Sequence, residues 1–156
     1  MSILTPLERL EQMAHNKNIT IYDYHIDNVC KGACCQIGNI KAIALDKKTM
    51  ASEAEETEIL AEEIGHYETG ALYKIDATIN SPISRSNIIK FEAQAKQWSY
   101  RELLPFQSIQ SAIDMYRIDN IEELAEYFNL LPDFVSEALN YYRTLGIEIE
   151  FLICEG

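Results

Sequence analysis

Most of the strand-like apolar patterns of this chain lie in one short part, before residue 46, and this most limits the folds it can adopt. A β-branched and aromatic stretch at residues 19–26 predicts one strand. Gly38-Asn39 is a strong turn signal, and the apolar residues 40–45 after it predict a second, buried strand. Residues 29–37 are ambiguous between strand and turn. Two strands around one turn indicate a hairpin within a small sheet.

Helical periodicity dominates the rest of the chain. Thr5-Pro6 predicts the start of a first helix that runs to His15, and Ser52 with Glu55 has the spacing of a capping box at the start of another. Further helices are expected at residues 87–104, 108–115, 121–128 and 132–145, after a long loop at 69–87 and before a terminal strand at 147–153. This order predicts an α+β fold, with a short antiparallel or mixed sheet packed on a helix and additional C-terminal helices.

Composition limits the partners and the location. The 156 residues carry 13 Lys or Arg against 25 Asp or Glu, a formal charge of −12, which argues against nucleic acid and anionic membranes as partners. The length suits a single domain over residues 1–156, with the sheet and the first helices in 1–116 and a helical segment in 117–156. Residues 1–16 lack the basic start and apolar core of a signal peptide, and no run approaches the roughly 18 apolar residues of a membrane span. We therefore expect a cytoplasmic protein.

The cysteines do not form a recognisable framework. Cys30, Cys34 and Cys35 are followed by only one distant cysteine, Cys154. Structural zinc sites usually show two paired knuckles, and a disulfide framework is unexpected without a secretion signal. We interpret all four as reduced, semi-buried residues.

Glu62-Glu63-Ile64-Gly65-His66 is the most informative stretch for chemistry. In a His-Glu-x-x-His motif, two metal ligands one helical turn apart share a helix face, and the intervening Glu acts as a general base. Here the spacing is kept with Glu62 in the first ligand position and His66 in the second. Glu63 is rotated by about 100° around the helix, toward a metal-bound water. The alternative is a solvated acidic helix end with an exposed histidine.

A third ligand is expected from another element, and Glu92 is the candidate. It lies on the largely apolar helix that contains Phe91 and Ala95, where a carboxylate near the inward side needs a partner. A metal ion shared with His66 would supply one. The alternative is a boundary residue that pairs with Arg85 or Lys96.

These stretches together resemble the ImmA/IrrE family of metallopeptidases, especially its short members from phages and mobile elements. The resemblance covers roughly residues 5 to 145. It includes the strand at 40–45, Glu62-Glu63-Ile64-Gly65-His66, and the downstream Glu92-x-x-Ala95-x-x-Trp98 with Leu104-Pro105. It continues into Leu124-Ala125-Glu126-Tyr127-Phe128. The resemblance implies a small zincin-like fold.

The resemblance also implies roles for individual residues. His66 matches the second zinc-binding histidine, Glu63 the catalytic glutamate and Glu92 the acidic third ligand. Glu62 stands where most of the family has the first zinc-binding histidine, although phage-type members often share Glu-Glu-x-Gly-His. Two carboxylate ligands lower the Lewis acidity of the ion, so Mn²⁺, or no metal at all, is the alternative to Zn²⁺.

The implied activity is site-specific hydrolysis of a phage-like repressor or a similar transcription regulator. Glu63 would take a proton from water and return it to the leaving amine. Tyr67 or Tyr73 could stabilise the oxyanion, and the strand at 40–45 could receive an extended substrate by edge pairing. The alternative is a catalytically inactive module of the same fold that binds a regulator; an acidic mimic of DNA rests on charge alone.

The C-terminal helical pair has the lengths of a helix-turn-helix, but its charge is unsuited to DNA. Residues 117–156 hold two Arg against nine Asp or Glu. A recognition helix with Asp133 and Glu137 would be repelled by phosphate. Core packing or docking of a partner protein is the better interpretation of this segment.

Overall fold

The computed structural model describes residues 3–26, 30–72 and 82–151. Helix α1 (Pro6–Asn16) and strands β1 (Ile19–Asp23), β2 (Gly32–Ile37) and β3 (Ile40–Leu45) come first. A short 3-10 turn at Lys47–Thr49 precedes α2 (Glu53–Thr69), α3 (Pro82–Leu103), α4 (Phe106–Tyr116), α5 (Ile121–Phe128) and α6 (Pro132–Thr144). The α+β class is confirmed, with a mixed three-stranded sheet.

Strand β3 lies in the middle of the sheet, whose order is β1-β3-β2. It pairs in parallel with β1, where Ile19 is opposite Lys41, and antiparallel with β2, where Gly32 is opposite Leu45. The predicted hairpin of residues 19–26 with 40–45 was wrong, because these two strands pair in parallel. The turn at Gly38-Asn39 is confirmed, but it joins β2 to β3, and Gly38 has a φ of 59°. Edge pairing of a substrate with residues 40–45 was wrong, because both edges of β3 are already occupied. The ambiguous residues 29–37 contain β2, which is an edge strand.

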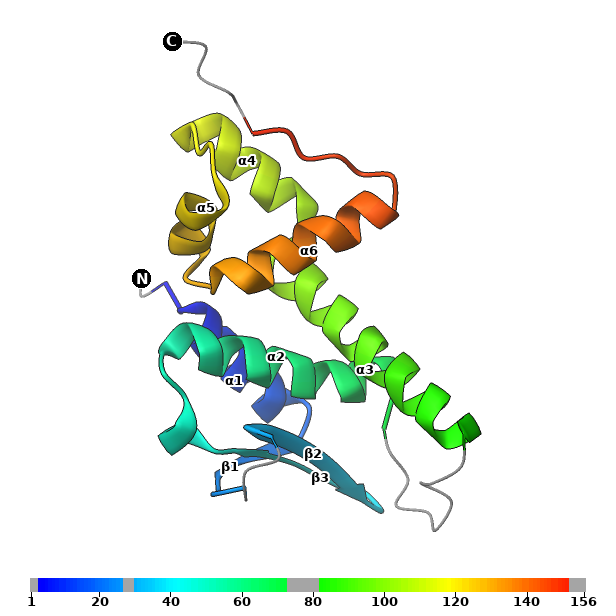
Figure 1. Cartoon of the computed structure of the whole chain (residues 1–156). Coiled ribbons are helices and arrows are strands. Elements are labelled where there is room, and N and C mark those ends of the chain that lie inside the picture. The colour runs from blue at the N-terminus through cyan, green and yellow to red at the C-terminus, as the bar shows by residue number, and fades with distance from the viewer. Residues whose placement is uncertain (1–2, 27–29, 73–81, 152–156) are drawn as a thin grey trace.

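Helix α2 crosses the sheet (Figure 1), and several of its residues are buried in the core. Its first turn is capped by Ser52, whose Oγ accepts from the Glu55 N–H at 3.2 Å. Glu55 accepts in turn from the Ala51 N–H at 2.6 Å, one residue before the position expected in a capping box. Leu60 and Ile64 are fully buried against Ile43 and Leu45 of the sheet, with the other members of the same cluster. One side of α2 therefore packs on β3, and an adjacent side of the same helix faces α3.

Helices α2 and α3 approach one another closely at Gly65. A Cβ atom on Gly65 would lie 2.6 Å from the carbonyl oxygen of Ala95 and 3.2 Å from its Cα. These are backbone atoms, so they cannot give way as a flexible side chain would. The absence of a side chain at Gly65 therefore sets how near α3 comes to the neighbouring His66.

Gly65→Ala tests this close approach. In a free helix the replacement stabilises by about 1 kcal/mol, because alanine has the higher helix propensity. Overpacking against Ala95 destabilises the fold by about 1–3 kcal/mol and should exceed the gain in helix propensity. We therefore expect a lower free energy of unfolding in urea. A variant more stable than the wild type would show that α3 moves away without cost.

The helices toward the C terminus differ from their predicted bounds in instructive ways. α5 matches the prediction, and α6 ends at Thr144, one residue early. α3 starts at Pro82 and not at residue 87, since proline is well suited to a first helical turn. The terminal strand at 147–153 was wrong over its described part, because residues 147–151 have no regular secondary structure and pair with none of the described strands. Residues 152 and 153 lie outside the described part.

The C-terminal helices α4 to α6 pack above α2 and α3 (Figure 1). The Leu131 N–H before α6 donates to the Glu58 carboxylate of α2 at 2.6 Å, and the Tyr142 hydroxyl donates to the Leu104 carbonyl at 2.6 Å. Phe134, Val135 and Ala138 of α6 are buried. The core-packing interpretation of this segment is therefore confirmed for α6.

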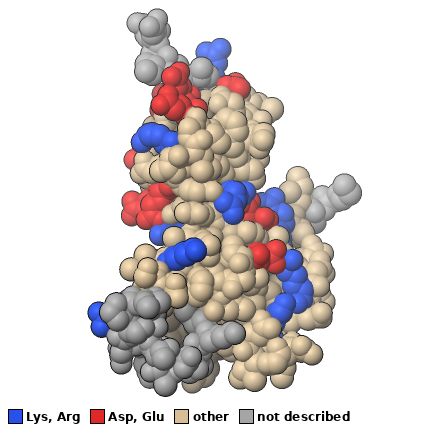
Figure 2. All heavy atoms as spheres, turned by 90° about the vertical axis from the view of Figure 1, so that its right-hand side faces the viewer, with Lys and Arg blue, Asp and Glu red and all other residues tan. Residues whose placement is uncertain are grey.

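Charges are mixed on the face shown in Figure 2. Lys and Arg lie among Asp and Glu there, so the acid excess of the chain forms no continuous acidic surface on that face. Of the helices in the described ranges, none combines the length and the apolar character that crossing a membrane requires.

Candidate metal and catalytic site

The predicted site residues line one open pocket of about 460 Å³ between α2, α3 and the start of β2. Glu62, Glu63 and His66 come from α2, and Glu92 comes from α3. The backbone and side chains of residues 30–34 form the opposite wall. The structure thus brings together the four residues predicted for this site, which are three residues of the α2 motif and Glu92 as the third ligand.

His66 is held in one orientation. Its side chain is buried, with 3% of the residue exposed, and Nδ1 lies 2.8 Å from the carbonyl oxygen of Ala71. Because a carbonyl can only accept, Nδ1 carries the proton and Nε2 keeps its lone pair when the ring is neutral. Nε2 faces Glu92, 3.7 Å from Oε1. A backbone carbonyl that accepts from one ring nitrogen, with the other nitrogen toward the pocket, is the arrangement typical of metal-binding histidines.

Glu63 is a carboxyl group that titrates near neutrality. Burial raises its pKa to about 7, Glu62 and Glu92 add to the rise, and His66 and a hydrogen bond from the Cys34 thiol oppose it. A group with this pKa can accept a proton and return it at neutral pH. Glu63 therefore has the properties of a general acid–base residue.

Glu62 and Glu92 share a hydrogen bond between their carboxyl groups. Burial raises the pKa of Glu62, Lys96 opposes the rise, and the charge and hydrogen bond of Glu92 add to it. Two adjacent carboxylates repel one another. A cation between them would relieve that repulsion, so the donor chemistry suits a metal ion.

The donors do not yet form a finished metal centre. Within the described residues, no three His, Cys, Asp or Glu side chains converge into a group that could hold an ion as they stand. The His66 ring and the two carboxyl groups offer the nitrogen and oxygen ligands that zinc and manganese accept. Binding would require Glu62 and Glu92 to exchange their mutual hydrogen bond for the ion.

Tyr67 does not reach this pocket. Its hydroxyl lies between β2 and β3, where it accepts from the Ala42 N–H at 3.1 Å, donates to the Ala42 carbonyl at 2.7 Å and also contacts the Cys35 carbonyl. Burial raises the pKa of Tyr67 to about 12. We therefore interpret Tyr67 as a link between α2 and the sheet, not as an oxyanion stabiliser. Tyr73, the other candidate, lies outside the described residues.

Tyr67→Phe should loosen α2 from the sheet. It removes one hydroxyl and leaves the backbone groups of Ala42 without that partner, which costs about 1 kcal/mol in the free energy of unfolding. Tyr22→Phe is the matched control, because Tyr22 is 56% exposed on β1. Equal urea midpoints for the two variants would contradict this role.

Sequence reasoning missed Cys34 and Gly32. The semi-buried interpretation fits Cys34, whereas Cys30 and Cys35 are exposed, and all three are free thiols; Cys154 lies outside the described residues. A Cβ atom on Gly32 would lie 2.5 Å from Ile59 Cγ2 and 3.1 Å from Glu63 Oε1. Glycine thus lets the backbone of β2 run directly beside Glu63. No local pattern signals either contact, because both join a strand to a helix far along the chain.

Comparisons with known proteins add no relative. No protein-family model matches the sequence, and searches of curated proteins and of solved structures gave no match.

Proposed function

We propose that this chain is a metal-dependent endopeptidase with a zincin-like fold, which cuts an extended segment of a repressor-type transcription regulator. One observation carries the proposal: His66 is fixed through Nδ1 with Nε2 toward Glu92, next to a buried glutamate of near-neutral pKa. General acid–base chemistry and metal ligation need these two arrangements side by side.

His66, Glu62 and Glu92 would hold the ion, Zn²⁺ by the resemblance to ImmA/IrrE peptidases and Mn²⁺ as the alternative. When bound, the ion polarises the scissile carbonyl and lowers the pKa of water. Cys34 lies against Glu63 and not among these ligands. Its hydrogen bond orients the Glu63 carboxylate within the pocket.

Glu63 performs the proton transfers. It accepts a proton from the attacking water as the new carbon–oxygen bond forms. It then gives the proton to the amide nitrogen as the carbon–nitrogen bond breaks, so that the products are a carboxylic acid and an amine. A pKa of about 7 suits both directions of transfer at neutral pH.

The outer edge of β2 is where we place the substrate. Among the described strands, β2 pairs only with β3, and its first residues form a wall of the pocket. An extended peptide added to this edge would run past Glu63, because Gly32 brings the β2 backbone directly beside that side chain. The need for an unfolded, strand-forming segment would restrict cleavage to few sites. A cytoplasmic regulator of a phage or mobile element is the substrate that the family resemblance suggests.

A non-catalytic module of the same fold is the second candidate. It is favoured by the incomplete convergence of the ligands among the described residues. Such a module would bind the regulator at the same strand edge without hydrolysing it.

Two measurements separate these candidates. Equilibrium dialysis of the purified chain should give one Zn²⁺ or Mn²⁺ per molecule, and co-expression with the regulator encoded beside its gene should give two defined fragments. Stoichiometric metal with cleavage supports the peptidase. An intact regulator that co-purifies with a metal-free chain would instead support the binding module.

A further inference from the structure

Residues 147–151, which we call the C-terminal strap, have no regular secondary structure and follow α6 as an extended trace (Figure 1). Ile147, Ile149 and Phe151 are half-buried and pack against the core, while Glu148 and Glu150 alternate with them and are exposed. This alternation is that of a strand with one covered face. The strap passes over the C-terminal helices, at the end of the molecule away from the sheet (Figure 1).

The backbone of the strap forms few hydrogen bonds to other described segments. Within the described residues, its one backbone hydrogen bond to another segment runs from the Ile147 N–H to the Tyr142 carbonyl at 3.0 Å. The side chains alternate above and below an extended segment, so its amide and carbonyl groups point sideways along both edges. An unpaired edge of this kind is a template for another strand.

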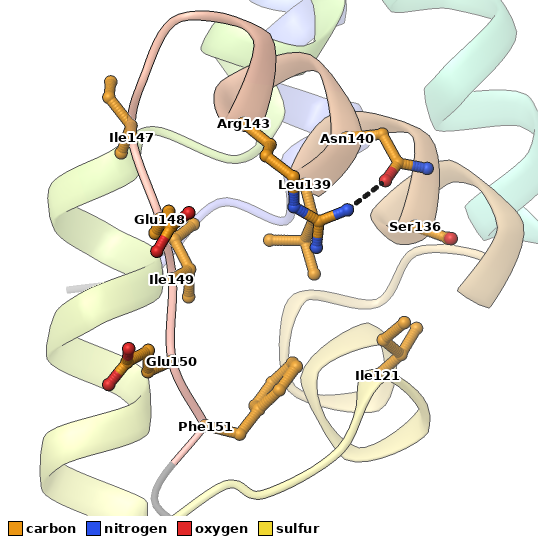
Figure 3. A pocket seen from close by; sticks show the side chains of 10 residues that line it. All are labelled: Ile121, Ser136, Leu139, Asn140, Arg143, Ile147, Glu148, Ile149, Glu150 and Phe151. Atoms are coloured by element: carbon orange, nitrogen blue, oxygen red, sulfur yellow. Dashed lines mark hydrogen bonds between the residues drawn. The ribbon is translucent and has the colours of Figure 1, made fainter.

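A groove of about 430 Å³ runs along the strap on the side of α5 and α6. Its lining residues come from the strap, from Ile121 at the start of α5 and from Ser136, Leu139, Asn140 and Arg143 of α6. Figure 3 shows the Leu139 and Arg143 side chains directed from α6 toward the strap, with Phe151 and Ile121 at the far end. Arg143 donates to Asn140 Oδ1 at 2.9 Å, which ties the groove's cation to its own helix.

We propose that this groove binds an extended peptide of a partner protein, which pairs with the strap as an added strand. The shape supports a peptide, because one wall is extended backbone and the other is a helix, as in grooves that bind by strand addition. Apolar side chains of the peptide would cover Leu139 and Ile121. Its alternate side chains would lie beside Glu148 and Glu150.

Charge indicates that those alternate side chains are cationic. Residues 117–151 hold eight Asp or Glu against Arg117 and Arg143. A second copy of this chain pairing through its own strap would bring Glu148 and Glu150 against like charges, which disfavours self-association. The occupant is therefore an extended segment in which apolar and basic residues alternate.

Calorimetric titration of the full chain with a blocked octapeptide of alternating Val and Lys tests the proposal. We expect saturable one-to-one binding, amide shifts in residues 136–151 by NMR, and affinity at least about tenfold weaker for the alternating Val and Glu peptide. N-methylation of every Val nitrogen removes the donors along one edge of the peptide, and N-methylation of every Lys nitrogen removes those along the other edge, so one of these two peptides should lose binding. Binding that survives both N-methylations, or none up to about 1 mM, overturns the proposal.

A matched pair of variants excludes general attraction to an acidic protein. Glu148→Lys with Glu150→Lys should lower the affinity for the peptide of alternating Val and Lys at least about tenfold. Glu102→Lys with Glu126→Lys changes the net charge equally at exposed positions outside the groove and should have little effect. Equal losses in both pairs overturn the proposal, as does concentration-dependent dimerisation without peptide binding. Glu63→Gln should bind the peptide like the wild type, so failure here is independent of the proposed peptidase activity.

Discussion

Replacing Glu63 with Gln should abolish regulator cleavage while making the protein more stable at pH 8. Glutamine keeps the size of the side chain and can still accept a hydrogen bond from Cys34, but it cannot carry a proton from water to the leaving amine. Loss of a general base of this kind lowers the rate about 10²- to 10⁴-fold. The measurement is the appearance of the two fragments over time, with equal amounts of wild-type and variant chain.

The gain in stability follows from the sign of the pKa change. The pKa of Glu63 is raised from 4.5 to about 7 in the folded chain, so between these values the folded state binds more protons than the unfolded one. The free energy of unfolding therefore falls as the pH rises through this window, and the full cost of ionising Glu63 is present above pH 7. Glu63→Gln removes that cost, which is on the order of 1–3 kcal/mol, in urea titrations with EDTA present.

Glu58→Gln is the matched control, since Glu58 lies on the same helix and burial raises its pKa likewise to about 7. Glu58 accepts from the Leu131 N–H and does not line the pocket, so this variant should gain stability at pH 8 and keep its cleavage rate. If both variants lower the cleavage rate equally, Glu63 has no specific role in proton transfer. If neither gains stability, the carboxyl groups are not held in their neutral forms.

Where a local signal existed, the sequence predicted the elements well. Asn129 adopts a left-handed conformation that ends α5, and the predicted helix at residues 121–128 ends at the same place. Strand 40–45 was found from its apolar run, but its position in the sheet was not. A strand apolar on both faces is more often central than at an edge, and that argument could have corrected the edge-pairing prediction. β2 stayed ambiguous between strand and turn because Gly32, at its start, has weak strand preference.

The same division holds for the candidate site. Helical spacing alone predicts that Glu62 and His66 are neighbours and that Glu63 is turned from them. Glu92 was a candidate because a carboxylate near the inward side of an apolar helix needs a partner. Its distance from His66 could not be predicted, since it depends on how closely Gly65 lets α3 approach. The Ala71 carbonyl and the Cys34 thiol were beyond prediction, because each contact depends on where a chain segment returns in space.

His66→Ala should reduce zinc affinity at least about a hundredfold, because His66 is the one nitrogen donor proposed for the ion. The two remaining carboxylates bind zinc weakly and repel one another without it. Equilibrium dialysis measures the affinity, and His15→Ala is the control, since His15 is exposed on α1 and outside the pocket. The loss should be complete for regulator cleavage as well.

A second variant keeps this prediction separate from misfolding. His66→Ala also removes the hydrogen bond to Ala71 within a buried part of the chain, which costs about 1–3 kcal/mol in stability. Glu92→Gln leaves that bond intact, and the Glu92 side chain is 46% exposed, so its fold should be unaffected. This variant should nevertheless lower the zinc affinity about tenfold or more, because a neutral amide replaces a charged ligand. If Glu92→Gln binds zinc as tightly as the wild type, Glu92 of α3 is not a metal ligand. If the zinc affinity is unchanged in both variants, this pocket does not bind the metal.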